Sequence, residues 1–191
     1  MSAGPRAGPR ESAVLVPFHR GDDGAWRLVV VRRAEGGIHG GQLAFPGGSR
    51  APEDATLFDT ALREAGEEIG LPAGAVRLLA ALPPVETRVS NYVIAPFLAR
   101  IERPRAWAPD PREIAEVLEP ALAELLRPGV RAHADDLMPA GMPPRRLPFY
   151  RVGPHRLWGA SERILHPLLA RIAAGEWPEV AANAGADRTR T

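Results

Sequence analysis

Three glutamates follow a glycine pair at helical spacing, and they are the residues of this chain best suited to chemistry. Glu64, Glu67 and Glu68 stand at i, i+3 and i+4, so on a helix they share an arc of roughly 100°. Crowded carboxylates repel one another and raise each other's pKa. A hard cation such as Mg²⁺, which takes oxygen ligands and is shared with substrate phosphates, would relieve that repulsion. A solvated acidic helix face would explain the glutamates, but not the Gly-Gly turn at residues 47–48 before them.

The helix that carries these glutamates is predicted to begin near Pro52 and to stop at Gly70. Proline suits a first helical turn, acidic residues 53 and 54 would favour the helix dipole there, and glycine suits a left-handed end. Arg63 stands four residues before Glu67, close enough to brace it. The apolar positions recur every three or four residues and predict one buried face: Leu57, Phe58, Ala61, Leu62, Ala65 and Ile69.

Residues 48–71 resemble a Nudix box. Gly48, five residues, Asp54 and eight residues lead into Arg63-Glu64-x-x-Glu67-Glu68-x-Gly70-Leu71. The usual box has Glu where this chain has Asp54, and it is one residue shorter between that Glu and the Arg-Glu pair. The resemblance implies water attack on a diphosphate that is linked to another group.

The resemblance also implies roles for these residues. Glu64, Glu67 and Glu68 would bind Mg²⁺ or Mn²⁺, and Gly48 would be part of the same metal site. Arg63 would orient one of the glutamates. The backbone N–H groups of Gly47 and Gly48 could approach a phosphate closely, because no Cβ obstructs them. Nudix enzymes take their general base either from the box or from a later loop. Glu68 is ranked first for this role, Glu113 second and Glu86 third, with a solvated surface pair as the alternative for Glu113 and Glu116.

The flanks of the box are similar to the coenzyme A diphosphatases. Arg32, eight residues, Gly41 and three residues lead into Phe45-Pro46-Gly47-Gly48, with His39 inside this signature. The Asp in the box fits the same family, as do the segments at 82–85 and 157–160. The family prefers Ser and a second Arg where this chain has Arg33 and Gly37, and Arg33 is a candidate to replace the lost phosphate contact. Arg32, Arg33 and His39 are therefore candidate substrate-binding residues.

These patterns leave three functions open. The first is a diphosphatase for coenzyme A or its acyl derivatives, which would release 4′-phosphopantetheine (or its acyl form) and adenosine 3′,5′-bisphosphate. The second is a Nudix hydrolase for ADP-ribose or another nucleoside diphosphate derivative, which the altered Arg33/Gly37 segment keeps open. The third is a Nudix-fold binding module, which has no need of clustered, mutually repelling acids.

The amino-acid composition excludes several other classes of function. The 191 residues include neither cysteine nor lysine, which excludes disulfides, thiol chemistry and lysine Schiff bases. Net charge is +1 and the arginines are dispersed, so nucleic-acid binding is not expected. No apolar run is long enough to span a membrane and no secretory signal is seen, so a cytoplasmic location is expected. The expected partner is a small nucleotide substrate, and a homodimer is possible.

The order of elements predicts an α/β protein. Mixed strands with one helix in the middle and one at the end indicate a three-layer α/β/α sandwich with a mixed β-sheet, which the Nudix resemblance also implies. Residues 12–176 are predicted to form a single domain, with disordered tails at 1–11 and 177–191. Pro96 in the strand at 92–101 predicts an edge or a bulge. Residues 111–118 are read as a strand or a short helix, and 127–146 as a long flap.

Overall fold

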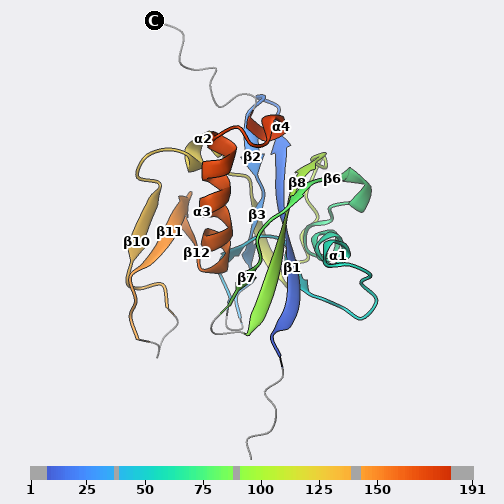
Figure 1. The fold of residues 1–191 in the computed structure, drawn as a ribbon, viewed down its shortest axis with the longest axis horizontal. Coiled ribbons are helices and arrows are strands. Elements are labelled where there is room, and N and C mark those ends of the chain that lie inside the picture. The colour runs from blue at the N-terminus through green and yellow to red at the C-terminus, as the bar shows by residue number, and fades with distance from the viewer. Residues whose placement is uncertain (1–7, 37–38, 88–90, 139–142, 182–191) are drawn as a thin grey trace, which may run out of the picture.

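The computed structural model describes residues 8–36, 39–87, 91–138 and 143–181. A six-stranded mixed sheet lies at the centre (Figure 1), in which β1 runs parallel to β8 and the other pairs are antiparallel. Its main path is β2-β1-β8-β6, while β5 pairs with β1 and β7 pairs with β8. The strands are β1 (Arg10–Arg20), β2 (Trp26–Leu28), β5 (Gly47–Ser49), β6 (Val76–Ala81), β7 (Val85–Glu86) and β8 (Tyr92–Ile101).

Two three-stranded sheets and the helices complete the fold. One small sheet has the order β4-β3-β9, with β3 (Val30–Arg33), β4 (Leu43–Ala44) and β9 (Ile114–Leu118). The other has the order β10-β11-β12, with β10 (Arg131–Ala134), β11 (Leu147–Val152) and β12 (His155–Trp158). The helices are α1 (Leu57–Ile69), the short 3₁₀ turn η1 (Ala73–Ala75), α2 (Leu122–Leu125), α3 (Ala160–Ala173) and α4 (Pro178–Ala181).

Strand β1 explains why helices cover both faces of the central sheet. Successive side chains of a strand point to opposite faces. Ala13 and Leu15 pack in one core cluster with α1, whereas Val16 and Phe18 pack in the other with α3. In Figure 1, α1 and α3 accordingly lie on opposite sides of β1 and β8. The predicted α/β/α sandwich with a mixed sheet is confirmed.

Helix α1 begins later than the sequence predicted. Thr56 is its N-cap, and its hydroxyl accepts from the Asp59 amide at 3.1 Å while the Asp59 carboxylate accepts from the Thr56 amide at 2.9 Å. This reciprocal capping box starts the helix at Leu57, so the prediction of a start near Pro52 was wrong. The predicted end is confirmed, since Gly70 is left-handed with φ 68°.

Pro96 does not mark an edge. Strand β8 lies between β1 and β6, and Pro96 pairs with Val14 of β1. On its other side β6 ends at Ala81 and β7 begins at Val85, and the Pro96 carbonyl accepts from Leu82 in that gap. A proline is tolerated in this central strand because its missing N–H falls between two short partner strands.

The ordered chain extends past both predicted domain boundaries. Strand β1 begins at Arg10, inside the segment predicted as an N-terminal tail. At the other end Trp177 and Val180 are 8% and 0% exposed, so residues 177–181 belong to the packed domain. The predicted tail start at 177 was therefore wrong, because these two apolar side chains join the α3 core. Residues 1–7 and 182–191 of the predicted tails lie outside the described residues.

The remaining ambiguous segments take definite forms. Residues 114–118 form strand β9 rather than a helix, and strand β10 lies inside the segment read as a flap.

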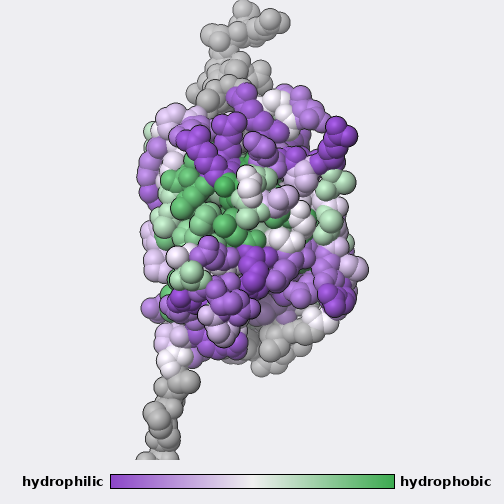
Figure 2. All heavy atoms as spheres, turned by 90° about the vertical axis from the view of Figure 1, so that its right-hand side faces the viewer, coloured by the Kyte–Doolittle hydropathy of each residue, from purple (hydrophilic) through white to green (hydrophobic). Residues whose placement is uncertain are grey.

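Among the described residues no helix is long and apolar enough to cross a membrane. Figure 2 views the side that carries α1 and β6, where apolar surface lies between polar bands. Leu78 of β6 is 43% exposed, and a homodimer remains a prediction.

Candidate active site

Arg63 of α1 is the hub of the site. Its Nε and Nη2 atoms bind the two carboxylate oxygens of Asp54 at 3.0 and 3.1 Å, and Nη2 also donates to the Ser49 carbonyl at 3.1 Å. Nη1 lies 3.0 Å from Glu67, and Nη2 lies 3.0 Å from Glu64. One guanidinium thus ties the loop before α1 to two of the glutamates on it.

The Asp54 side chain contacts this site and does not lie in the first turn of α1, where it would interact with the helix dipole. Its residue is 7% exposed, and its carboxylate also accepts from the Ala51 amide at 2.8 Å. The two hydrogen bonds from Arg63, followed by the bond from Ala51, hold the pKa of Asp54 far below its usual range. Asp54 is therefore an anchor for Arg63, which reading it as a first-turn residue had missed.

Glu68 is buried against the glycine pair. It is 2% exposed, and its Oε2 accepts from the Gly47 amide at 2.9 Å. Arg33 of β3 places Nη1 3.7 Å from Oε1 of the same carboxylate. Burial raises the pKa of Glu68 to about 7, and the Gly47 amide and Arg33 oppose that rise. Glu64 and Glu113 add repulsion in the same direction as burial.

Glu64 lies where residue 48 would carry a side chain. A Cβ on Gly48 would stand 2.4 Å from the carboxyl carbon of Glu64, so only glycine leaves room for this carboxylate. Burial raises the pKa of Glu64, with smaller contributions from Glu67 and Glu113, while Arg63 lowers it. Gly47 is also required, since its φ is 151° and a Cβ there would meet the Ala13 carbonyl at 2.2 Å.

Glu67 and Glu113 are exposed members of the same neighbourhood. The side chain of Glu67 is 61% exposed and bonds Arg63. Glu113 lies in the turn before β9, where its carbonyl accepts from the Ala34 amide at 2.7 Å. Its charge acts on both Glu64 and Glu68, which places it near the cluster as the sequence had suggested. Glu86 instead lies on β7, where its carbonyl accepts from Arg163 of α3.

Arg32 and His39 are held by other partners. Arg32 lies 3.3 Å from both Glu35 and Glu116, so two carboxylates already compensate its charge. The Nδ1 atom of His39 lies 3.2 Å from the Gln42 side-chain oxygen, at the surface. Of the three candidate substrate-binding side chains, Arg33 is the one that contacts a glutamate of α1. Gly37, where the related enzymes prefer Arg, lies outside the described residues.

Comparison with known proteins identifies the family to which the chain belongs. The NUDIX domain model matches residues 9–140, well over half of the chain. The chain belongs to the Nudix hydrolase family. An uncharacterized Nudix hydrolase, NudL, of Cronobacter sakazakii is 37% identical over 170 residues, which cover 88% of this chain and 85% of that protein. The NudL protein of Klebsiella pneumoniae is 34% identical over 177 residues, which cover 86% and 84%.

Solved structures support the Nudix fold. A MutT/nudix family protein from Enterococcus faecalis superposes with a TM-score of 0.63 over 96% of this chain and 70% of that chain, at 17% identity. A Nudix hydrolase from M. Smegmatis, RenU, gives 0.52 over 62% and 74%, at 23% identity. At these identities the likeness concerns the fold alone.

Nudix membership implies hydrolysis of a diphosphate linkage with a divalent metal ion, and the donor set can be tested against that need. Within the described part of the chain, no three His, Asp or Glu side chains stand close enough together to hold an ion. Mg²⁺, however, is usually bound by one or two carboxylates, with waters and substrate phosphates completing its shell. Glu64 and Glu68 meet beside a backbone that lacks Cβ atoms and repel one another, so the residues fit such an ion.

Proposed function

We propose that this protein is a metal-dependent diphosphatase of coenzyme A or acyl-coenzyme A. The observation that carries the proposal is the segment from Arg32 to Gly48, which resembles the coenzyme A diphosphatase signature and brings Arg33 within 3.7 Å of Glu68. Arg33 follows Arg32 in the segment that resembles the coenzyme A signature, and Glu68 belongs to the Nudix helix. The segment thought to recognise the substrate therefore opens directly onto the carboxylates thought to act on its diphosphate.

The side chains would divide the work as follows. Glu64 and Glu68, with Gly48 beside them, would hold a divalent ion, and Glu67 would join them as a ligand by moving its exposed side chain toward them. When bound, the ion would polarise a phosphoryl oxygen and neutralise developing charge. Glu68, whose carboxylate accepts from the Gly47 amide at 2.9 Å, is the first candidate for the general base. Glu113 is the second candidate. Arg63 keeps two of the glutamates in place, and Arg33 would meet a phosphate of the substrate.

Hydrolysis would give 4′-phosphopantetheine, or its acyl form, and adenosine 3′,5′-bisphosphate. The second candidate function is hydrolysis of ADP-ribose or another nucleoside diphosphate derivative. The observation that favours it is the presence of Arg33 and Gly37 where coenzyme A diphosphatases prefer Ser and Arg. A binding module without turnover is the third candidate, and the repelling pair Glu64 and Glu68 argues against it.

The Arg33→Ala variant separates the first two functions. Its KM for coenzyme A should rise about tenfold or more and far more than its KM for ADP-ribose, because a charge-assisted phosphate contact is lost. Arg127→Ala, an exposed arginine after α2, is the matched control and should leave both constants unchanged. Equal effects of Arg33→Ala on the two substrates would refute its role in recognising coenzyme A.

The Glu67→Gln variant tests the metal assignment. Glu67 is exposed, so the substitution should leave the fold intact while abolishing metal-dependent hydrolysis. Circular dichroism and turnover with Mg²⁺ or Mn²⁺ would be measured on the same preparation. A folded Glu67→Gln protein that keeps wild-type activity would show that the metal is held elsewhere.

A further inference from the structure

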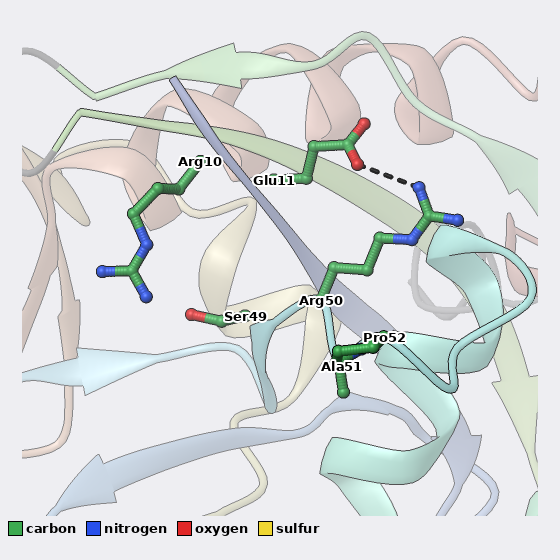
Figure 3. A pocket seen from close by; sticks show the side chains of 6 residues that line it. All are labelled: Arg10, Glu11, Ser49, Arg50, Ala51 and Pro52. Carbon is green, nitrogen blue, oxygen red and sulfur yellow. Dashed lines mark hydrogen bonds and ion pairs between the residues drawn. The ribbon is translucent and has the colours of Figure 1, made fainter. Parts of the chain in front are cut away.

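An open surface pocket of about 440 Å³ lies beside the turn at Gly47 and Gly48, and the side chains that line it have no role in the proposed chemistry. Figure 3 shows it between the start of β1 and the segment after β5. The two strands are neighbours because Ser12 of β1 pairs with Ser49 of β5. The lining residues are Arg10, Glu11, Ser49, Arg50, Ala51 and Pro52.

Arg10 carries the positive charge of this pocket that no carboxylate compensates among the described residues. Among the described residues it makes no ion pair, and its guanidinium carbon lies 4.8 Å from the centre of the Tyr92 ring. Arg50 differs, because its Nη1 lies 2.9 Å from Glu11 and its Nη2 donates to the carbonyls of residues 54 and 55. Glu11 is therefore neutralised, and the free positive charge belongs to Arg10, whose guanidinium extends toward the Ser49 side in Figure 3.

Two hydroxyl groups meet beside that guanidinium. The Ser49 Oγ lies 3.1 Å from the Tyr92 hydroxyl, and Tyr92 pairs with Arg10 across the parallel β1–β8 ladder. Hydroxyls can donate to an anion, and a planar guanidinium presents a fork of donors to phosphate oxygens. An arginine that has no carboxylate partner in the described part of the chain, and that stacks on a tyrosine beside two hydroxyls, fits an oxyanion.

Ser49 connects this donor set to the catalytic helix. Its carbonyl accepts from Arg63, while its hydroxyl faces Tyr92. The preceding residue, Gly48, lies against Glu64. The pocket therefore adjoins the residue that lies against Glu64, one of the candidate metal ligands.

We propose that Arg10, Ser49 and Tyr92 bind a phosphate monoester, and that in coenzyme A this group is the 3′-phosphate of the ribose. The inference rests on the proposed function. In that substrate one ribose carries both the diphosphate and the 3′-phosphate, so two neighbouring anion sites of different kinds are required. A monoester carries a charge of about −1.5 to −2 at neutral pH, which the guanidinium of Arg10, unpaired among the described residues, would attract.

Comparison of coenzyme A with dephospho-coenzyme A tests the site, because the two substrates differ only in the 3′-phosphate. Arg10→Ala should lower kcat/KM for coenzyme A about tenfold or more and leave kcat/KM for dephospho-coenzyme A within about twofold. Arg100→Ala is the matched control, since Arg100 stacks over Trp26 near the other end of the same strand pair. It should affect neither substrate. Equal loss on both substrates with Arg10→Ala would overturn the proposal.

A binding measurement keeps the site testable if the protein does not hydrolyse coenzyme A. Titration calorimetry with adenosine 3′,5′-bisphosphate and with AMP should show tighter binding of the bisphosphate, and Arg10→Ala should abolish that difference. Failure of turnover with both coenzyme A forms would refute the proposed function, and the calorimetry would still decide the site. Equal affinity of the wild-type protein for the two nucleotides would overturn the monoester site.

Discussion

Arg63 binds Asp54 through two hydrogen bonds of 3.0 and 3.1 Å, one to each carboxylate oxygen. The pair explains the unusual first half of the box. Asp54 sits in the loop two residues before the N-cap Thr56, not on the helix. Asp54 is shorter than the usual Glu, and the box has one additional residue. The Asp54 carboxylate nevertheless contacts the Arg63 guanidinium, which also contacts Glu64 and Glu67.

Asp54→Asn should therefore impair catalysis through Arg63. The amide keeps the shape of the side chain but removes the charge that anchors the guanidinium, so Glu64 and Glu67 lose a fixed neighbour. Small misplacements of this kind cost about tenfold to a hundredfold in rate. Steady-state kinetics would show the loss. Glu176→Gln breaks a similar pair between Glu176, just after α3, and Arg171 of α3, and serves as the control. Comparable activity of the two variants would contradict the anchoring role.

Gly48→Ala should lower activity about a hundredfold. The new Cβ would stand 2.4 Å from the Glu64 carboxyl carbon, so that carboxylate must move. Gly74→Ala is the control, because a Cβ there meets no atom within 4 Å and its activity should be unchanged. Wild-type rates for Gly48→Ala would show that the observed Glu64 position is not the working one.

The buried carboxylate of Glu68 should make the metal-free protein less stable as pH rises. Its pKa is about 7 in the fold and 4.5 when unperturbed, so between these values the folded state binds a proton that the unfolded state has lost. Stability relative to Glu68→Gln should then fall by at most about 1.4 kcal/mol per pH unit across that window. Urea unfolding in a chelating buffer at several pH values measures this difference. A difference that does not change with pH would mean that Glu68 titrates normally.

Ending the chain at residue 176 should destabilise the protein by about 3–5 kcal/mol, the usual cost of losing a buried large side chain. The truncation removes Trp177 and Val180, which are 8% and 0% exposed. A chain that ends at residue 181 keeps both side chains and should unfold at the wild-type denaturant concentration. If both truncations unfolded alike, the packing of α4 would contribute nothing to stability.

Local patterns predicted much of this molecule. The hairpin of β11 and β12 can be recognised in the sequence, because two short segments rich in apolar residues flank the turn at Gly153. The Arg63-Glu64-x-x-Glu67-Glu68 segment predicted the helix face that carries the site. These features depend on residues close together in sequence, where periodicity and turn chemistry are informative.

The unpredicted features depend on partners far away in sequence. Strand β5 contains two glycines, which disfavour strands, and it forms because β1 offers a pairing edge. The start of α1 was misplaced because Pro52 resembled a first-turn proline, whereas the capping box of Thr56 and Asp59 prevailed. Trp177 looked like part of a tail because only the folded α3 core provides it with a contact surface.

The identity of the products from coenzyme A tests the central claim most directly. Purified protein would be incubated with Mg²⁺ or Mn²⁺ and coenzyme A, with ADP-ribose, NADH and dinucleoside polyphosphates in parallel, and the products identified by mass. We expect 4′-phosphopantetheine and adenosine 3′,5′-bisphosphate as products, and no products when the metal is chelated. Intact coenzyme A beside hydrolysed ADP-ribose would contradict the substrate assignment, and no turnover of any compound would contradict the assignment as an enzyme.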